Sequence, residues 1–303
     1  MGKILITGGT GLVGSRFDGE EYLKIGSKNL DLLNQTDISD FLSDNKVDGI
    51  IHCAARVGGV GGNMSYPGEF TYENLKMNTG IIEEARKAGI KKMISFSSTC
   101  VFPDKVDYPL TPNKIHLGPP HHSNYGYAYA KRMTDVQMQA YREQYGVNYF
   151  SVIPCNIYGP SDNYNLENGH VIPSLIHKFH LANILGTDVT IWGSGSPLRE
   201  FIFSEDVAKL TRILFDNYIE GTPVIISSGK EISIKEVVSI IASQFNFRGK
   251  IIWDLDKPEG QFRKPSDNSV IRSIAPDFKF TSIGEGIYKS VKWFKENYPN
   301  IRK

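Results

Sequence analysis

The first half of the chain alternates short apolar runs with longer amphipathic stretches. The apolar runs lack the strict polar–apolar alternation of a half-exposed strand, and strands that helices cover on both faces have this pattern. The stretches Thr71–Lys87 and Tyr127–Tyr145 predict helices between such strands. This order predicts an α/β fold with a doubly wound parallel sheet. The apolar runs are Lys3–Thr7, Gly49–Cys53, Met93–Ser97 and Tyr149–Ile153.

The second half begins with a turn-rich segment of glycine, proline and short polar residues, Gly159-Pro160-Ser161-Asp162-Asn163. We expect a first domain over 1–160, completed by part of 199–228, and a smaller α/β lobe formed by 161–198 and 229–303. One continuous domain is the alternative. The elements expected after residue 160 are a strand at Val189–Trp192 and helices at Val171–Ile184, Glu205–Asn217, Ile234–Phe245 and Ile287–Tyr298.

Composition and charge narrow the class of protein. The 303 residues carry a net charge of +1, without the basic excess of a nucleic-acid binder. No apolar run reaches the roughly 18 to 20 residues that cross a bilayer. The odd count of 3 cysteines argues against a disulfide framework or a structural zinc site. We therefore expect a cytoplasmic protein with no metal, no nucleic-acid partner and no membrane partner.

A glycine-rich segment, Thr7 to Gly14, directly follows the first expected strand and is expected to open a helix. In such a motif Gly8 allows a tight turn, Gly11 lets the backbone approach a pyrophosphate, and Gly14 permits close helix–strand packing. The N–H groups at the helix start then bind the diphosphate. Turns also collect glycine, but strand, spacing and helix coincide here and predict a Rossmann-type dinucleotide site.

Tyr127 and Lys131 are four residues apart on an expected helix and therefore share a face. An ammonium beside a phenol favours the phenolate and lowers its pKa, which gives a proton donor near neutral pH. A solvated helix face with an extended lysine is the alternative. Ser98 ends an expected strand at the same crevice, where its hydroxyl can hydrogen-bond a carbonyl.

These three features resemble the extended short-chain dehydrogenase/reductase superfamily. Further segments are similar to the GDP-L-fucose synthase family, and the similarity runs from the first strand to the last helix. The segments that carry it are Ala54-Ala55-Arg56-Val57-Gly58-Gly59, Ser98-Thr99-Cys100-Val101-Phe102-Pro103, Pro154-Cys155-Asn156-Ile157-Tyr158-Gly159-Pro160, Gly169-His170-Val171-Ile172-Pro173, Trp192-Gly193-Ser194-Gly195 and Val291-Lys292-Trp293-Phe294.

The resemblance implies a bifunctional NADPH-dependent 3,5-epimerase/4-reductase that converts GDP-4-keto-6-deoxy-D-mannose to GDP-L-fucose. The 4-keto group acidifies the C–H bonds at C3 and C5, so epimerisation needs an acid and a base on opposite faces. By matching motif, Cys100 and His170 are that pair. Tyr127 donates a proton to O4, Ser98 hydrogen-bonds O4, and Lys131 holds the ribose and tunes Tyr127. Without the resemblance, Cys100 reads as an inert small residue and His170 as a loop cap.

The resemblance also implies the binding residues. Lys28, with Ser27, is expected to accept the 2′-phosphate of NADP, and no acidic residue ends the second strand to favour NAD. The expected substrate residues are Lys178, Trp192, Arg199 and Glu259. Their ordinary alternatives are a surface lysine, a core tryptophan and a structural ion pair. The cofactor residues are Gly8, Thr10, Gly11, Leu12, Val13, Gly14, Lys28, Ala54, Ser97, Lys131, Pro154, Asn156, Ile157 and His170.

Two other functions stay open at this point. A reductase or epimerase of another GDP-4-keto sugar, such as a heptose derivative, needs only a slightly roomier pocket. A non-catalytic regulator that senses the dinucleotide predicts loss of Tyr127 or Lys131, and both are present. The family resemblance further implies a homodimer joined through the helices Thr71–Lys87 and Tyr127–Tyr145.

Overall fold

A parallel six-stranded sheet forms the centre of the larger part of the molecule, in the order β2-β1-β3-β4-β5-β9. The computed structural model describes residues 2–257 and 261–302. The sheet confirms the expected doubly wound α/β fold, and β9 falls within the segment 199–228. The strands are β1 (Lys3–Thr7), β2 (Tyr22–Ile25), β3 (Val47–His52), β4 (Lys92–Phe96), β5 (Asn148–Pro154) and β9 (Val224–Ile226).

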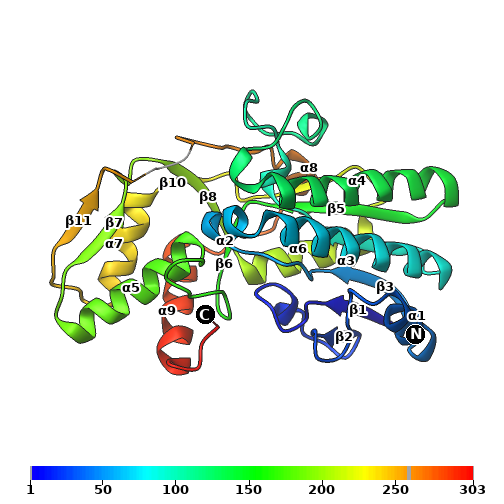
Figure 1. Ribbon diagram of the computed structural model, residues 1–303, viewed down its shortest axis with the longest axis horizontal. Helices are drawn as coiled ribbons and strands as arrows, with labels where there is room; N and C mark the ends of the chain where they lie inside the picture. Colours follow the sequence, from blue (N-terminus) through cyan, green and yellow to red (C-terminus); the bar gives the residue numbers. More distant parts are fainter. Residues whose placement is uncertain (1, 258–260, 303) are drawn as a thin grey trace.

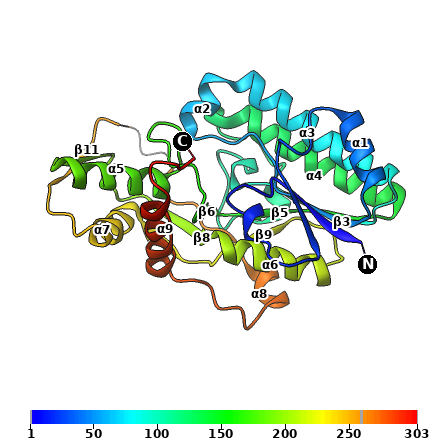
Figure 2. The same cartoon turned by 90° about the horizontal axis from the view of Figure 1, so that it is seen from below.

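Helices cover both faces of this sheet (Figures 1 and 2). On one face the strand residues Leu5 and Met93 pack in a fully buried cluster with Ile81 and Met138. On the other face Ile94 packs in a second cluster with Leu210 and Leu214. Burial on both faces explains why the strands read as continuous apolar runs. The first face carries α1 (Gln35–Asp44), α3 (Pro67–Lys87) and α4 (Tyr125–Tyr145), and the second carries α6 (Ser204–Asn217) and α8 (Ser269–Ile274).

A smaller part, on the left of Figure 1, has its own apolar core. The helices α5 (Val171–Leu185), α7 (Ile234–Gln244) and α9 (Ile283–Asn297) surround buried residues such as Ile176, Val237 and Phe294. The ranges 161–198 and 229–303 expected for a separate lobe contain these helices, but 229–303 also contains α8, which packs on the central sheet. Two small sheets complete this part: β10 (Glu231–Ser233), β8 (Leu198–Phe203) and β6 (Asn156–Tyr158), and β11 (Ile251–Asp254) with β7 (Val189–Trp192).

The prediction that a helix begins at the glycine motif is wrong. Only a single 3₁₀ turn, η1 (Gly14–Arg16), follows Val13. The chain then buries Phe17 in the core and enters β2 at Tyr22, which leaves no room for a full helix. The glycine loop is therefore followed by a short connection where a doubly wound sheet normally has its first helix.

Short elements connect the remaining parts of the chain. The segment after β3 forms α2 (Val60–Ser65), and the loop after β4 contains η2 (Thr99–Val101), η3 (Pro112–Lys114) and η4 (His122–Asn124). Across the described residues, none of the helices combines the length and the apolar character needed to span a bilayer.

Candidate active site

The glycine loop after β1 forms a compact turn. Gly8 has φ +66°, and a side chain on Gly14 would overlap the Gly8 carbonyl oxygen. Among backbone groups of the described chain, the N–H groups of Leu12 and Val13 have no acceptor. Successive free N–H groups in a loop bind anions without a long helix behind them. An anion at this position would therefore meet the N–H groups of the loop itself and not the dipole of a long helix.

Several other expected cofactor residues follow the carboxyl ends of the strands, and Asn156 and Ile157 lie in β6 of a second sheet. Ala54 follows β3, and its N–H donates to Thr7 Oγ1 over 3.4 Å. Ser97 follows β4, while Pro154 ends β5 and Asn156 begins β6. Lys28 lies exposed beyond the carboxyl end of β2. The carboxyl ends of parallel strands form the crevice in which such sheets bind ligands.

The four residues expected to act on the ketone come from two neighbouring segments. Ser98 and Cys100 flank the start of η2, where the Cys100 N–H donates to Ser98 Oγ over 3.4 Å. Tyr127 and Lys131 lie on α4, with Lys131 Nζ 5.9 Å from the centre of the Tyr127 ring. The Arg132 Nε–H donates to the Val101 carbonyl over 2.7 Å and fixes α4 against η2. The structure therefore brings these four residues together.

The expected effect of Lys131 on Tyr127 is not found. Burial raises the pKa of Tyr127, and Cys100 raises it further. Burial also lowers the pKa of Lys131 to about 8, and its side chain is only 1% exposed. Because removal from water penalises both charged forms, burial outweighs the attraction between ammonium and phenolate. Tyr127 is accordingly a protonated phenol at neutral pH, the form that donates a proton.

The sequence analysis did not predict a buried hydrogen-bond network that joins Thr7 of β1, His52 of β3 and Asn78 of α3. His52 Nδ1 is 2.7 Å from Thr7 Oγ1, and His52 Nε2 is 3.0 Å from Asn78 Oδ1. Burial lowers the pKa of His52 to about 3, and the nearby Lys131 lowers it too. The imidazole is therefore neutral and connects the strand that carries the glycine loop to α3. Only the fold brings these positions together.

Lys264, also missed, lies beside Cys100. Burial raises the pKa of the Cys100 thiol, whereas Ser98 and then the Lys264 and Lys131 cations lower it. The segment that carries Lys264 is attached to the loop after η2 on both sides. Gln261 Nε2 donates to the Asp104 carbonyl over 2.8 Å, and the Leu110 N–H donates to the Pro265 carbonyl over 2.9 Å.

His170 lies at the N-terminal cap of α5, and its side chain is 52% exposed. Its Nδ1 is 3.9 Å from Oδ1 of the buried Asp162. The interaction with Asp162 raises the pKa of His170, while burial and the Arg302 cation lower it. The Gly59 N–H donates to the Asn168 carbonyl over 2.9 Å, which joins the His170 loop to the segment after β3.

Two of the expected substrate residues meet in the smaller part of the molecule. Lys178 Nζ lies 5.9 Å from the Trp192 ring centre, and Lys257 Nζ lies 5.8 Å from it. Trp192 is 61% exposed and is therefore not a core residue. Arg199 lies on β8, and burial lowers its pKa. Glu259 falls outside the described residues.

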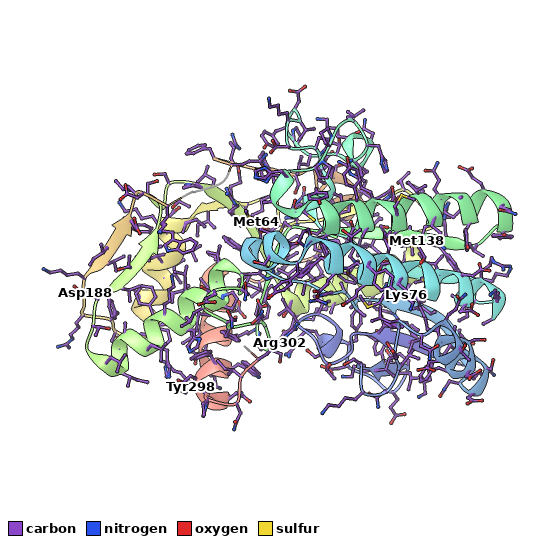
Figure 3. The ribbon with its side chains drawn as sticks, viewed as in Figure 1. Met64, Lys76, Met138, Asp188, Tyr298 and Arg302 are labelled. Carbon is purple, nitrogen blue, oxygen red and sulfur yellow. The ribbon has the colours of Figure 1, made fainter. Side chains whose placement is uncertain are left out.

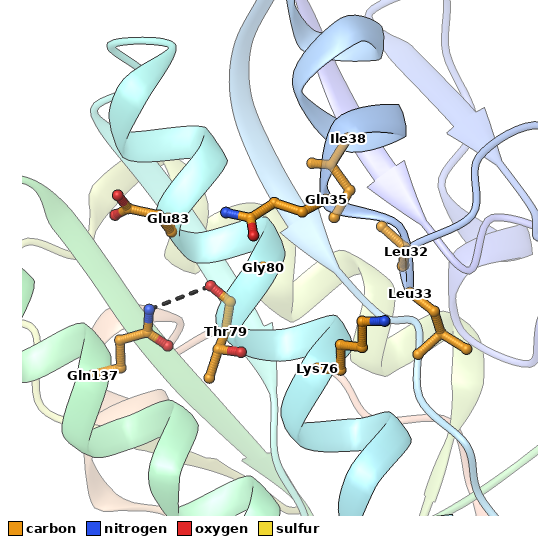
Figure 4. A pocket seen from close by; sticks show the side chains of 9 residues that line it. All are labelled: Leu32, Leu33, Gln35, Ile38, Lys76, Thr79, Gly80, Glu83 and Gln137. Carbon is orange, nitrogen blue, oxygen red and sulfur yellow. Dashed lines mark hydrogen bonds between the residues drawn. The ribbon is translucent and has the colours of Figure 1, made fainter.

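A cavity of about 170 Å³ adjoins Lys178 and the start of β7. Asp188, which also lines it, marks the far end of this part in Figure 3. A second cavity, of about 300 Å³, lies between α1, α3 and α4 (Figure 4). Gln137 closes one side of it and donates to the Thr79 carbonyl. None of the expected site residues lines this second cavity. Across residues 2–257 and 261–302, no three His, Cys, Asp or Glu side chains are placed to hold a metal.

Comparison with known proteins identifies the family of the chain. The family model described as the NAD dependent epimerase/dehydratase family matches residues 4–227. A probable GDP-L-fucose synthase of Drosophila melanogaster is 43% identical over the full length of both chains. The GDP-L-fucose synthase of Dictyostelium discoideum is 45% identical, covering 99% of this chain and 97% of that protein.

A solved structure has the same fold throughout. The GDP-L-fucose synthetase of Naegleria fowleri, bound to NADP, aligns with a TM-score of 0.94 and 40% identity. The alignment covers 100% of this chain and 95% of that chain. The chain belongs to the NAD dependent epimerase/dehydratase family, the extended branch of the short-chain dehydrogenases/reductases. Within that family, the expected resemblance to GDP-L-fucose synthases is confirmed.

Proposed function

We propose that the chain is an NADPH-dependent enzyme that epimerises GDP-4-keto-6-deoxy-D-mannose at C3 and C5 and then reduces C4 to give GDP-L-fucose. The observation that carries the proposal is that Ser98 and Cys100, which follow β4, lie together with Tyr127 and Lys131 of α4. The resemblance to GDP-L-fucose synthases along the whole chain supports the choice of substrate.

Epimerisation requires one group that removes a proton next to the ketone and another that returns a proton to the opposite face. Cys100 is the assigned base: burial raises the pKa of its thiol, and Ser98, Lys264 and Lys131 each offset part of that rise. His170 serves as the acid, because Asp162 favours its protonated form. The C–H electron pair passes to the carbonyl oxygen as an enolate and returns to carbon on reprotonation.

Reduction places new negative charge on O4, which the protein must neutralise. Tyr127 supplies the proton, and the Ser98 hydroxyl hydrogen-bonds the same oxygen. Lys131, buried beneath Tyr127, binds the ribose hydroxyls of the cofactor. When bound, NADPH supplies the hydride for C4.

The residues at the sheet edge fit a dinucleotide phosphate. The free N–H groups of Leu12 and Val13 receive the pyrophosphate, and the turn at Gly8 keeps side chains away from it. The exposed Lys28 pairs with the 2′-phosphate, which favours NADPH over NADH. Of the remaining cofactor residues proposed from the sequence, Ala54, Ser97 and Pro154 lie at the carboxyl ends of β3, β4 and β5, and Asn156 and Ile157 lie in β6.

The smaller part of the molecule supplies the nucleotide end of the substrate site. The indole of Trp192 lies open for stacking between the Lys178 and Lys257 cations. Arg199 bridges diphosphate oxygens in this proposal, because a guanidinium binds phosphate bidentately. Glu259, proposed from the sequence alone, stays a candidate for the same site.

We also propose a homodimer that acts in the cytoplasm. Large exposed side chains recur on α4 at helical spacing, and Tyr72 is exposed on α3, which supports an interaction surface. The proposed thiol base requires a reducing compartment, and all 3 cysteines are free. The exposed residues on α3 and α4 are Tyr72, Tyr125, Tyr129, Met133 and Val136.

The deciding experiment incubates GDP-4-keto-6-deoxy-D-mannose with the protein and NADPH in D₂O and measures the mass of the product. Two carbon-bound deuteriums with NADPH oxidised indicate exchange at C3 and C5 followed by reduction. Oxidation of NADPH without carbon-bound deuterium contradicts the epimerase half and removes the roles given to Cys100 and His170. No reaction contradicts the substrate, and a GDP-4-keto-heptose is then the second substrate to assay.

A further inference from the structure

The Asp162 carboxylate is buried in the loop between β6 and α5, with 3% of the residue exposed. Its Oδ1 accepts the Asn163 N–H over 2.7 Å. Within the described part of the chain, its Oδ2 has no hydrogen-bond partner. A buried carboxylate oxygen without a donor is costly, so its presence requires an explanation.

The loop that holds Asp162 is fixed at several points. Ser161 has φ +67°, a left-handed conformation that is unfavourable for a residue with a side chain. Arg16, from the glycine loop, donates to Ser161 Oγ over 3.0 Å. Further along, Asn165 Oδ1 accepts the N–H groups of Glu167 and Asn168. The loop therefore has a defined shape, and the position of Asp162 under His170 follows from it.

Two charged groups face the His170 imidazole from the elements packed against it. Asp162 lies on the preceding loop, with its Oδ1 3.9 Å from Nδ1. Arg302 comes from the C-terminal segment, and its carbonyl accepts the Tyr164 N–H over 2.9 Å. Figure 3 places Arg302 between the two parts of the molecule. The carboxylate has the larger effect and favours imidazolium, whereas Arg302 opposes it.

We propose that Asp162 is a positioning residue that keeps Nδ1 of His170 protonated and turns Nε2 toward the substrate carbon. The proposal rests on the proposed function, in which His170 is the acid of the epimerisation. A carboxylate behind an imidazole fixes its tautomer and orientation and stabilises the imidazolium. The 3.9 Å separation is longer than a hydrogen bond, as is common for catalytic groups before substrate binds.

The first test measures the protonation of His170 directly. Imidazole signals of the full-length protein are followed by NMR against pH, and His170→Gln identifies the His170 signal. Asp162→Asn keeps an oxygen for the Asn163 N–H but removes the charge, so the His170 midpoint should move to lower pH. Asp135→Asn is the matched control, because Asp135 lies 3.4 Å from a different imidazole, that of His116. An unchanged His170 midpoint in Asp162→Asn overturns the proposal.

The second test follows exchange of the C3 and C5 hydrogens with D₂O across pH. In Asp162→Asn, the loss of rate on the alkaline side should begin at lower pH, with roughly a 10-fold lower rate at pH 8. Reduction of an already epimerised ketone should change much less, which a general loss of folding does not produce. An equal loss of exchange at all pH values makes Asp162 merely structural and contradicts the proposal.

The two tests also separate this proposal from the proposed function. If His170→Gln leaves exchange intact, His170 is not the acid, and the proposed function fails at that residue. The NMR midpoint in Asp162→Asn still reports whether the carboxylate controls the imidazole. If the midpoint shifts but the exchange profile does not, the positioning role is overturned while the pairing stands.

Discussion

Arg16 Nη2 lies 3.0 Å from Ser161 Oγ, and this hydrogen bond joins the glycine loop to the loop that carries Asp162 and His170. Arg16 belongs to the single 3₁₀ turn that replaces the first helix of the sheet. Because the connection is short, the Arg16 side chain extends to the loop at Ser161 and contacts it. In the proposed function, this contact links the segment after the cofactor loop to the loop that presents the acid.

Arg16→Ala removes that contact. We expect the free energy of unfolding to fall by about 1 kcal/mol, the ordinary net value of such a hydrogen bond. C–H exchange should slow by several-fold, because the loop that presents His170 loses one support. Exchange measured in D₂O and NADPH binding measured by fluorescence check this prediction, with Arg212→Ala as a control that breaks contacts to Asp216 and Tyr22 instead. Weakened NADPH binding with normal exchange would instead make Arg16 a phosphate ligand.

Tyr127→Phe removes the proposed proton donor and little else. Reduction should slow by about 10² to 10⁴, the usual contribution of general acid catalysis, while cofactor binding stays nearly intact. Stopped-flow oxidation of NADPH with an epimerised ketone measures the step. Tyr129→Phe, two residues along the same helix and 44% exposed, is the matched control. Turnover near that of the unmodified protein rules out the role of Tyr127.

Cys100→Ser replaces the thiol by a much weaker acid at the same position. Exchange at C3 and C5 should slow far more than hydride transfer to a ketone that is already epimerised, because only the former needs the base. Comparing the two rates on the same preparation provides the control. Equal slowing of both steps would make Cys100 a residue that only positions the sugar.

Lys264→Met removes a cation that favours the Cys100 thiolate. The pKa of Cys100 should rise, so the base ionises at higher pH and the acidic limb of the exchange profile moves to higher pH. Lys264→Arg keeps the charge and should retain most of the original profile. A profile that Lys264→Met does not shift contradicts the assignment.

The buried His52 predicts a dependence of stability on pH. Its pKa in the folded protein is lowered to about 3, below the value of about 6.5 in an unfolded chain. The stabilising contribution is therefore complete above pH 6.5 and decreases as the pH falls toward 3, because only the unfolded state takes up the proton. The loss is about 1.4 kcal/mol per pH unit from this group. Urea unfolding of His52→Gln should give a lower stability at pH 8 but a flatter decrease below pH 6, whereas His116→Gln should keep the original slope.

Several elements could be predicted from local sequence because their pattern is strong. The strand Val189–Trp192 has the predicted bounds, and the helix predicted at Val171–Ile184 is one residue longer in the structure. The missing helix after Gly14 was not predicted, since a glycine motif is the same whether a long or a short connection follows it. The length of the chain between Arg16 and Tyr22 was the available signal.

The residues of the proposed site also divide into those with a local sequence signal and those without one. Tyr127 and Lys131 share a helix, so their spacing alone places them on one face. Asp162, Lys264 and His52 carry no comparable local signal. Asp162 approaches His170 only through the irregular course of one loop, and Lys264 and His52 act on partners that lie on other elements.

The sequence by itself determined the doubly wound sheet, the glycine loop and the residue types of the proposed chemistry, because these depend on periodicity and short motifs. The tertiary structure decided the pKa values of the ionisable side chains at the proposed site. Burial raises the pKa of Tyr127, where the spacing to Lys131 predicted a lower one, since the cost of removing charge from water depends on everything packed around a group. It also decided that Asp162 comes close to His170 within one folded loop, and that Lys264 lies beside Cys100 from a segment distant in the sequence.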